Sequence, residues 1–158
     1  MIHAMITPPS FNSLSRCRWV ATLCAALLLC TIVPSWATVD EAHDYAMQAA
    51  KPYVDNGYTV REDYWNGEVE SGQKLAIKHQ LFKGNDYAFW LGTANDNCEM
   101  DIAVYDDKMQ PVHMERKTSK NACSVRVNPP RTGTYTIVFY VKSKKEPSVL
   151  WALAYGYR

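Results

Sequence analysis

The stretch KGNDYAFWLG, residues 83–92, decides the fold of this chain. Its first four residues, with glycine and two turn-forming polar side chains, are typical of a tight turn. A strand follows, and its side chains alternate between two faces. One face carries large side chains that suit the core of a β-sandwich: Tyr87, Phe89 and Leu91.

The opposite face of this strand has a different composition. It carries a single indole, Trp90, between the small residues Ala88 and Gly92. A large aromatic side chain among small ones suits the close approach of a second element. We expect an N-terminal helix to pack there, and the alternative occupant is a ligand.

The predicted helix starts at a capping box in which Thr38 is the N-cap and Glu41 follows three residues later. Alanines then recur at helical spacing and form a flat stripe that permits close packing on a sheet. Pro52 lacks a backbone donor, so the helix is predicted to kink or end near Ala50. Asn56-Gly57 is typical of a left-handed stop after a helix.

From residue 58 onward the apolar period changes to two, and turn signals recur about every ten residues. Val60–Trp65 is the first predicted strand, and Asn66-Gly67 predicts a two-residue hairpin turn after it. Later strands follow with no intervening helix. The predicted fold class is mostly β, an antiparallel β-sandwich or jelly roll of about eight strands with one N-terminal helix.

The first 37 residues resemble a secretory signal peptide. Arg16 and Arg18 precede an apolar run of about 15 residues, and Ser35-Trp36-Ala37 offers small residues for cleavage. We therefore expect a signal peptide at 1–37, a helix packed on the sandwich at 38–57, a sandwich at 58–158, and a periplasmic or secreted location. The apolar run is short for a membrane span, and an uncleaved anchor is the alternative.

The charges are nearly balanced, with 17 Lys and Arg against 16 Asp and Glu. Nucleic-acid binding depends on clustered basic side chains, and the chain has no long basic run. The sequence therefore argues against a nucleic-acid partner. It favours an envelope or extracellular partner, either protein or polysaccharide.

Two of the five cysteines, Cys98 and Cys123, follow the predicted signal peptide. In an oxidising compartment two cysteines most economically form one disulfide, and we expect this bond. Two free thiols are the alternative. The neighbouring loop is rich in oxygen ligands and makes a weak calcium candidate; these residues are Asn95, Asp96, Asn97, Glu99 and Asp101. No other cofactor is indicated.

Three segments follow a recurring plan of apolar strands and turns: residues 81–90, 101–107 and 130–138. On these segments the chain resembles the bacterial pre-peptidase C-terminal domains, β-sandwiches appended to secreted proteases and other exported enzymes. The resemblance covers about residues 68–158. It implies a non-catalytic accessory module, and some relatives bind calcium or polymeric substrates. In this sequence the resembling segments follow the predicted helix, and we expect a module that stands alone.

Aromatic side chains supply the candidate ligand contacts. Tyr64, Trp65 and Trp90 are the residues that we predict to contact a ligand, since aromatic faces stack on sugar rings and also fill cores. The first two lie beside the predicted Asn66-Gly67 turn, where exposure is expected. For the aromatic side chains of the last strand, residues 149–157, core filling is the favoured role.

The sequence offers no Gly-x-Ser-x-Gly elbow or other catalytic constellation. We therefore expect a non-catalytic binding or interaction module of the cell envelope. One alternative is a small secreted hydrolase that uses His79 or His113 with a carboxylate. The other is a purely structural envelope protein.

Overall fold

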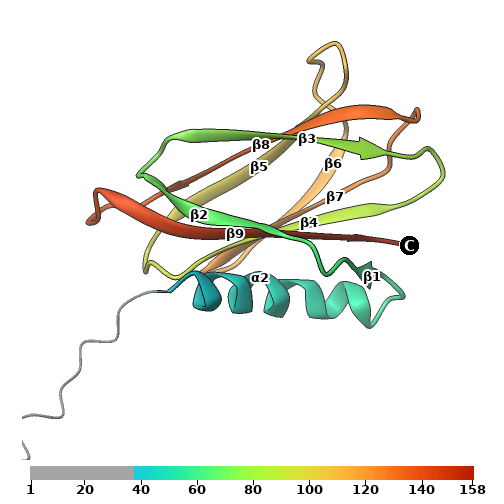
Figure 1. The fold of residues 1–158 in the computed structure, drawn as a ribbon. Coiled ribbons are helices and arrows are strands. Elements are labelled where there is room, and N and C mark those ends of the chain that lie inside the picture. Colours follow the sequence, from blue (N-terminus) through green and yellow to red (C-terminus); the bar gives the residue numbers. More distant parts are fainter. Residues whose placement is uncertain (1–37) are drawn as a thin grey trace, which may run out of the picture. The chain divides into compact units, whose positions relative to one another are not determined.

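The computed structural model describes residues 38–158, so the predicted signal peptide lies outside the described residues. Within the described part, one helix, α2 (Val39–Val54), precedes nine strands. The strands form two antiparallel sheets, and α2 lies against the outer face of the larger one (Figure 1). The predicted mostly-β sandwich with one N-terminal helix is confirmed.

The larger sheet has the spatial order β1-β9-β4-β7-β6. Strand β2 pairs with the same edge of β9 as β1 does, nearer the start of β9. The smaller sheet has the order β3-β8-β5. The strands are β1 (Thr59–Val60), β2 (Trp65–Glu70), β3 (Lys74–Leu81), β4 (Tyr87–Thr93), β5 (Glu99–Tyr105), β6 (Met114–Thr118), β7 (Ala122–Val127), β8 (Gly133–Lys142) and β9 (Ser148–Tyr157).

Both ends of α2 follow the capping signals of the sequence. The Thr38 hydroxyl accepts a hydrogen bond from the Glu41 N–H at 3.1 Å, which satisfies one of the free donors of the first turn. At the other end Gly57 adopts φ +88°, a left-handed conformation that glycine reaches without strain. The Tyr58 N–H then donates to the Tyr53 carbonyl at 3.1 Å, as in a Schellman-type helix end.

The helix does not end near Ala50, one of the two predicted outcomes, because α2 continues to Val54 with Pro52 inside it. A proline in the last turn removes only one backbone hydrogen bond. The side chain of the next residue, Tyr53, is buried against the sheet. This packing holds the last turn in place despite the proline.

The predicted strand Val60–Trp65 and the hairpin at Asn66-Gly67 are wrong. Strand β1 covers only Thr59–Val60, and Asn66-Gly67 lies inside β2, paired with β9 at Ala152 and Trp151. A Cβ at position 67 would lie 3.6 Å from the Trp151 indole. The local turn signal is overridden here because β2 gains a full ladder of hydrogen bonds along β9.

Strand β4 is buried along its whole length, because it separates two apolar layers. Its Tyr87, Phe89 and Leu91 side chains belong to the core between the sheets, as predicted. The last strand contributes to the same core with Trp151, Leu153 and other side chains, so its core-filling role is confirmed.

The second layer is the contact between α2 and the outer face of the larger sheet. Trp90 is fully buried there, together with the small residues Ala46 and Ala154. A Cβ on Gly92 would overlap the Ala42 carbonyl oxygen and would lie 2.6 Å from the Ala46 backbone nitrogen. The helix therefore approaches the sheet as closely as a glycine allows, and the predicted packing on this face is confirmed.

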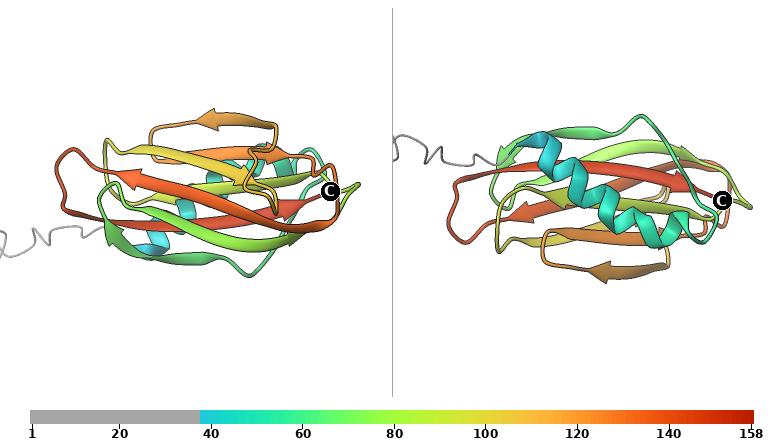
Figure 2. Two further views of the ribbon diagram at one scale, coloured as in Figure 1. Left: turned by 90° about the horizontal axis from the view of Figure 1, so that it is seen from above. Right: turned by 90° about the horizontal axis from the view of Figure 1, so that it is seen from below.

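The helix crosses this sheet diagonally (Figure 2, right). Near its start, His43 stacks on Tyr64, which lies just before β2. Near its end, Tyr53 reaches β7 through a 3.1 Å hydrogen bond between its hydroxyl and that of Ser124. Beyond β7 the edge strand β6 completes the sheet. This arrangement leaves a groove between the second half of α2 and strands β6 and β7.

Candidate ligand-binding groove

The aromatic residues predicted as ligand contacts lie in three different environments. Trp90 has no exposed surface and packs under α2, so it is a packing residue and not a surface contact. Tyr64 is half-buried, and its ring lies 4.0 Å from that of His43 at an interplanar angle of 21°. This stack fastens the segment before β2 to the helix.

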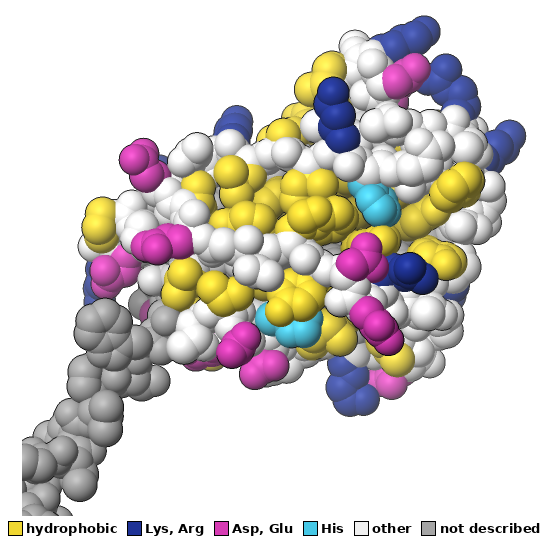
Figure 3. Space-filling view, viewed as in Figure 1, with side chains coloured by type: hydrophobic (Ala, Val, Ile, Leu, Met, Phe, Trp, Pro, Cys, Tyr) yellow, Lys and Arg dark blue, Asp and Glu magenta, His cyan; other side chains and the backbone are white. Residues whose placement is uncertain are grey.

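Trp65, also half-buried, belongs to an aromatic cluster on the open side of the sandwich, between the edge strands β2 and β3. Its ring centroid lies 5.5 Å from His79 and 5.4 Å from Tyr155. Apolar side chains form a band over this region of the surface (Figure 3). Since the three rings contact one another across the two sheets, they close the core at this side.

The structure does not bring a histidine into hydrogen-bond contact with a carboxylate within residues 38–158. His79 is half-buried, and burial lowers its pKa, an effect that the nearby Asp63 charge partly offsets. The Asp63 carboxylate instead accepts a 3.1 Å hydrogen bond from the Tyr155 hydroxyl. His113 is exposed in the loop before β6.

Four of the five calcium candidates bond to protein groups, and the fifth, Asn97, lies in a left-handed backbone conformation. Asp96 pairs with Lys120 at 2.9 Å and Asp101 pairs with Arg116 at 3.1 Å. The Asn95 side-chain oxygen accepts from a β9 N–H, Asn97 adopts φ +56°, and Glu99 accepts from the Tyr140 hydroxyl at 2.7 Å. In the part of the chain described, no group of three His, Cys, Asp or Glu side chains is placed to hold a metal ion.

The predicted disulfide is wrong, since Cys98 and Cys123 are both free thiols. The Cys98 thiol contacts the Asp96 carbonyl oxygen at 3.8 Å, just before β5 in the smaller sheet. Cys123 lies in β7 of the larger sheet, and its side chain is part of the core. Burial raises the pKa of both thiols, so the protonated, unreactive form is favoured.

The groove beside α2 contains two adjoining pockets. The first, of about 260 Å³, lies between α2 and the β6–β7 hairpin and is lined mainly by apolar surface. Its walls include Tyr45 and Ala49 of the helix and Ala122 of β7, with Tyr53 and Ser124 at its end. This apolar pocket has the size of a single large side chain.

The second pocket, of about 230 Å³, is polar and contains most of the charge of the groove. Lys117, Arg126 and Arg158 line it, and Glu115 is the single carboxylate among its lining residues. We call it the cationic pocket. An anion is therefore the ligand that its charge favours.

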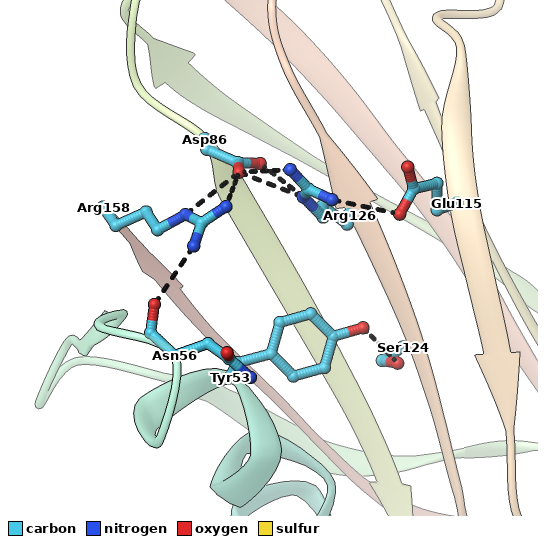
Figure 4. Close-up of polar contacts among 7 residues, drawn as sticks. All are labelled: Tyr53, Asn56, Asp86, Glu115, Ser124, Arg126 and Arg158. Atoms are coloured by element: carbon cyan, nitrogen blue, oxygen red, sulfur yellow. Dashed lines mark hydrogen bonds and ion pairs between the residues drawn. The ribbon is translucent and has the colours of Figure 1, made fainter.

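Asp86 holds the two guanidinium groups of the cationic pocket in place (Figure 4). Its carboxylate accepts from Arg126 at 2.7 Å and from Arg158 at 3.2 Å. Burial alone would raise the Asp86 pKa, but the hydrogen bonds from both arginines and the nearby Tyr58 hydroxyl lower it overall. The Asp86 side chain is only 12% exposed, so the arginines are fixed from behind.

Lys117 marks the boundary between the two pockets and lines both of them. Its Nζ lies 5.5 Å from the centroid of the Tyr53 ring, a cation–π contact. Within residues 38–158 this ammonium makes no ion pair, whereas both arginines are paired. It is the free positive charge of the groove.

Sequence reasoning missed this groove because its residues come from the helix, two strands and the last residue of the printed sequence. Each of Tyr53, Lys117, Arg126 and Arg158 is unremarkable in its own segment. One available signal was Arg126, a charged side chain in the otherwise buried strand β7.

The comparisons with known proteins assign the chain to no family. No protein-family model matches the chain, and no curated protein matches it. Among the described residues, α2 is too short and too polar to traverse a bilayer. A function for this chain is therefore inferred from the geometry of the groove.

Proposed function

We propose that this chain is an exported, non-catalytic binding module that holds an acidic partner in the groove between α2 and strands β6 and β7. The observation that carries the proposal is Lys117, an unpaired ammonium between two adjoining pockets. Export is the expectation from residues 1–37.

The electrostatics of the groove support an acidic partner. Three cations line the cationic pocket against Glu115, and Asp86 neutralises part of the charge from behind. The net local charge is positive, although the whole chain is nearly neutral. A positive groove on a neutral protein attracts anions locally and gives the site selectivity.

The composition of the groove favours binding over catalysis. Its lining includes the Ser124 hydroxyl, which bonds to Tyr53, but neither a histidine nor a cysteine. Nucleophilic catalysis needs a hydroxyl or thiol next to a general base. The half-buried His79 lies on the open side of the sandwich, in its contact with Trp65.

Isothermal titration with an acidic hexapeptide tests this proposal, with Lys117→Glu as the variant. We expect the charge reversal to weaken binding at least tenfold. Lys78→Glu, on the exposed face of β3, makes the same change of net charge and serves as the matched control. Equal affinities of the two variants would contradict the proposal.

A further inference from the structure

Resting on the proposed function, we infer that the groove takes the free C-terminal end of a polypeptide whose last side chain is apolar. The carboxylate would lie in the cationic pocket and the last side chain in the apolar pocket. The two pockets share Pro52, Tyr53 and Lys117, so a single residue that carries both groups can reach both.

Both arginines line the cationic pocket with guanidinium groups that Asp86 already orients. Arg126 uses Nε and Nη2 on Asp86 and Nη1 on Glu115, while Arg158 uses Nε and Nη2 on Asp86 and Nη1 on the Asn56 carbonyl. Each terminal nitrogen carries a second hydrogen that these bonds do not use. Guanidinium groups that are already oriented lose little entropy when they bind a carboxylate.

Glu115 is the one anionic group in the way. It accepts from Arg126 at 3.2 Å, but its side chain is 64% exposed and can turn into solvent. An incoming carboxylate would take its place on that guanidinium. Neutralising Glu115 should therefore strengthen binding of a carboxylate ligand.

The apolar pocket and the sheet edge favour a polypeptide over an acidic saccharide. Burying sugar hydroxyls against apolar surface costs free energy unless each finds a hydrogen-bond partner. Strand β6 pairs only with β7 among the described strands, so its other edge is open beside Lys117. An extended peptide can hydrogen-bond to such an edge, as in β-strand addition.

The test compares three fluorescent probes by polarisation with protein purified after expression of the full chain. These are a hexapeptide ending in Leu with a free carboxylate, the same peptide as an amide, and an oligogalacturonate. We expect the amide to bind at least tenfold more weakly than the free acid. Glu115→Gln should strengthen binding of the free acid about threefold, and Lys117→Glu should weaken it at least tenfold.

Further outcomes separate this inference from the proposed function. If the acid and amide peptides bind equally, or only the oligogalacturonate binds, and Lys117→Glu weakens that binding, the C-terminal inference is wrong and the proposed function stands. If no probe shows binding that depends on Lys117, both the inference and the proposed function are wrong.

Ala49→Trp, which would fill the apolar pocket, should weaken binding of the Leu-ended peptide at least fivefold. Unchanged affinity in that variant, with native circular dichroism, would contradict the placement of the last side chain.

Discussion

The Lys117 ammonium lies 5.5 Å from the centroid of the Tyr53 ring, and this contact joins the edge strand β6 to the last turn of α2. The Tyr53 hydroxyl is held by a hydrogen bond with the Ser124 hydroxyl. The two residues therefore place an unpaired positive charge over a rigid aromatic surface. This relationship ties the packing of the helix to the charge of the groove.

The close approach of α2 to β4 predicts a strong effect of Gly92→Ala. The new Cβ would overlap the backbone of the helix at Ala42 and Ala46, which cannot rotate away. We expect a loss of about 1–3 kcal/mol in the free energy of unfolding, measured by urea denaturation. Gly133→Ala is the control, since a Cβ there meets no atom within 4 Å. Equal stability of the two variants would contradict the tight helix–sheet contact.

Trp90 offers an independent check of the same layer. Because the indole is fully buried among small residues, Trp90→Ala would leave a cavity. We expect a cost of about 3–5 kcal/mol in unfolding free energy. A cost below about 1 kcal/mol would show that the helix does not cover this side chain in solution.

Asp86→Asn should destabilise the fold by about 2 kcal/mol, because two arginines lose their charged acceptor. The Asp86 pKa is lowered in the folded protein, so its contribution is complete above the unfolded value of about 3.9. It is lost as the pH falls through the lower folded pKa. The difference between wild type and variant should therefore shrink toward pH 2 in urea denaturation.

Asp107→Asn is the matched control for Asp86, because its ion pair with Arg131 is largely exposed. Exposed pairs contribute little, and we expect a change within about 0.5 kcal/mol. If this variant loses as much stability as Asp86→Asn, burial of the Asp86 carboxylate does not explain its effect.

Burial lowers the pKa of His79, which predicts a pH dependence of stability. The folded state favours the neutral imidazole, so this contribution is complete above the unfolded value of about 6.5 and declines as the pH falls below it. In His79→Leu, the loss of stability between pH 7.5 and pH 5.5 should be smaller than in wild type. His113→Gln should retain the wild-type dependence, and a wild-type profile in His79→Leu would refute the assignment.

Both thiols should be free in protein purified after expression of the full chain. Alkylation of denatured, unreduced protein followed by peptide mass mapping should find the label on Cys98 and on Cys123. Recovery of both peptides unlabelled until a reductant is added would show the disulfide that the sequence predicts and that the structure lacks.

The sequence predicted the layers of this fold well because the alternation in β4 is strong on both faces. Tyr87 and Trp90 point into different apolar layers, and both layers follow from the residue sizes alone. The prediction of a turn at Asn66-Gly67 was wrong because pairing with β9 outweighed the local turn signal. Local patterns contain no information about such long-range pairing.

The groove could not be predicted from the sequence for the same reason. Lys117 is one of several charged residues in a short, exposed edge strand, and such residues often only protect an edge from aggregation. Its position over Tyr53 depends on how the helix crosses the sheet. Of the residues predicted to contact a ligand, Trp90 instead supports the helix whose last turn forms one wall of the groove.

The location of the binding site is tested most directly by an NMR titration. Isotope-labelled protein would be titrated with the hexapeptide that ends in Leu with a free carboxylate, and the amide shifts would be mapped by residue. We expect the largest shifts in residues 45–57, in β6 and in β7, and we expect these shifts to be lost in Lys117→Glu. Shifts confined to the aromatic cluster of Trp65, His79 and Tyr155 between β2 and β3 would contradict it.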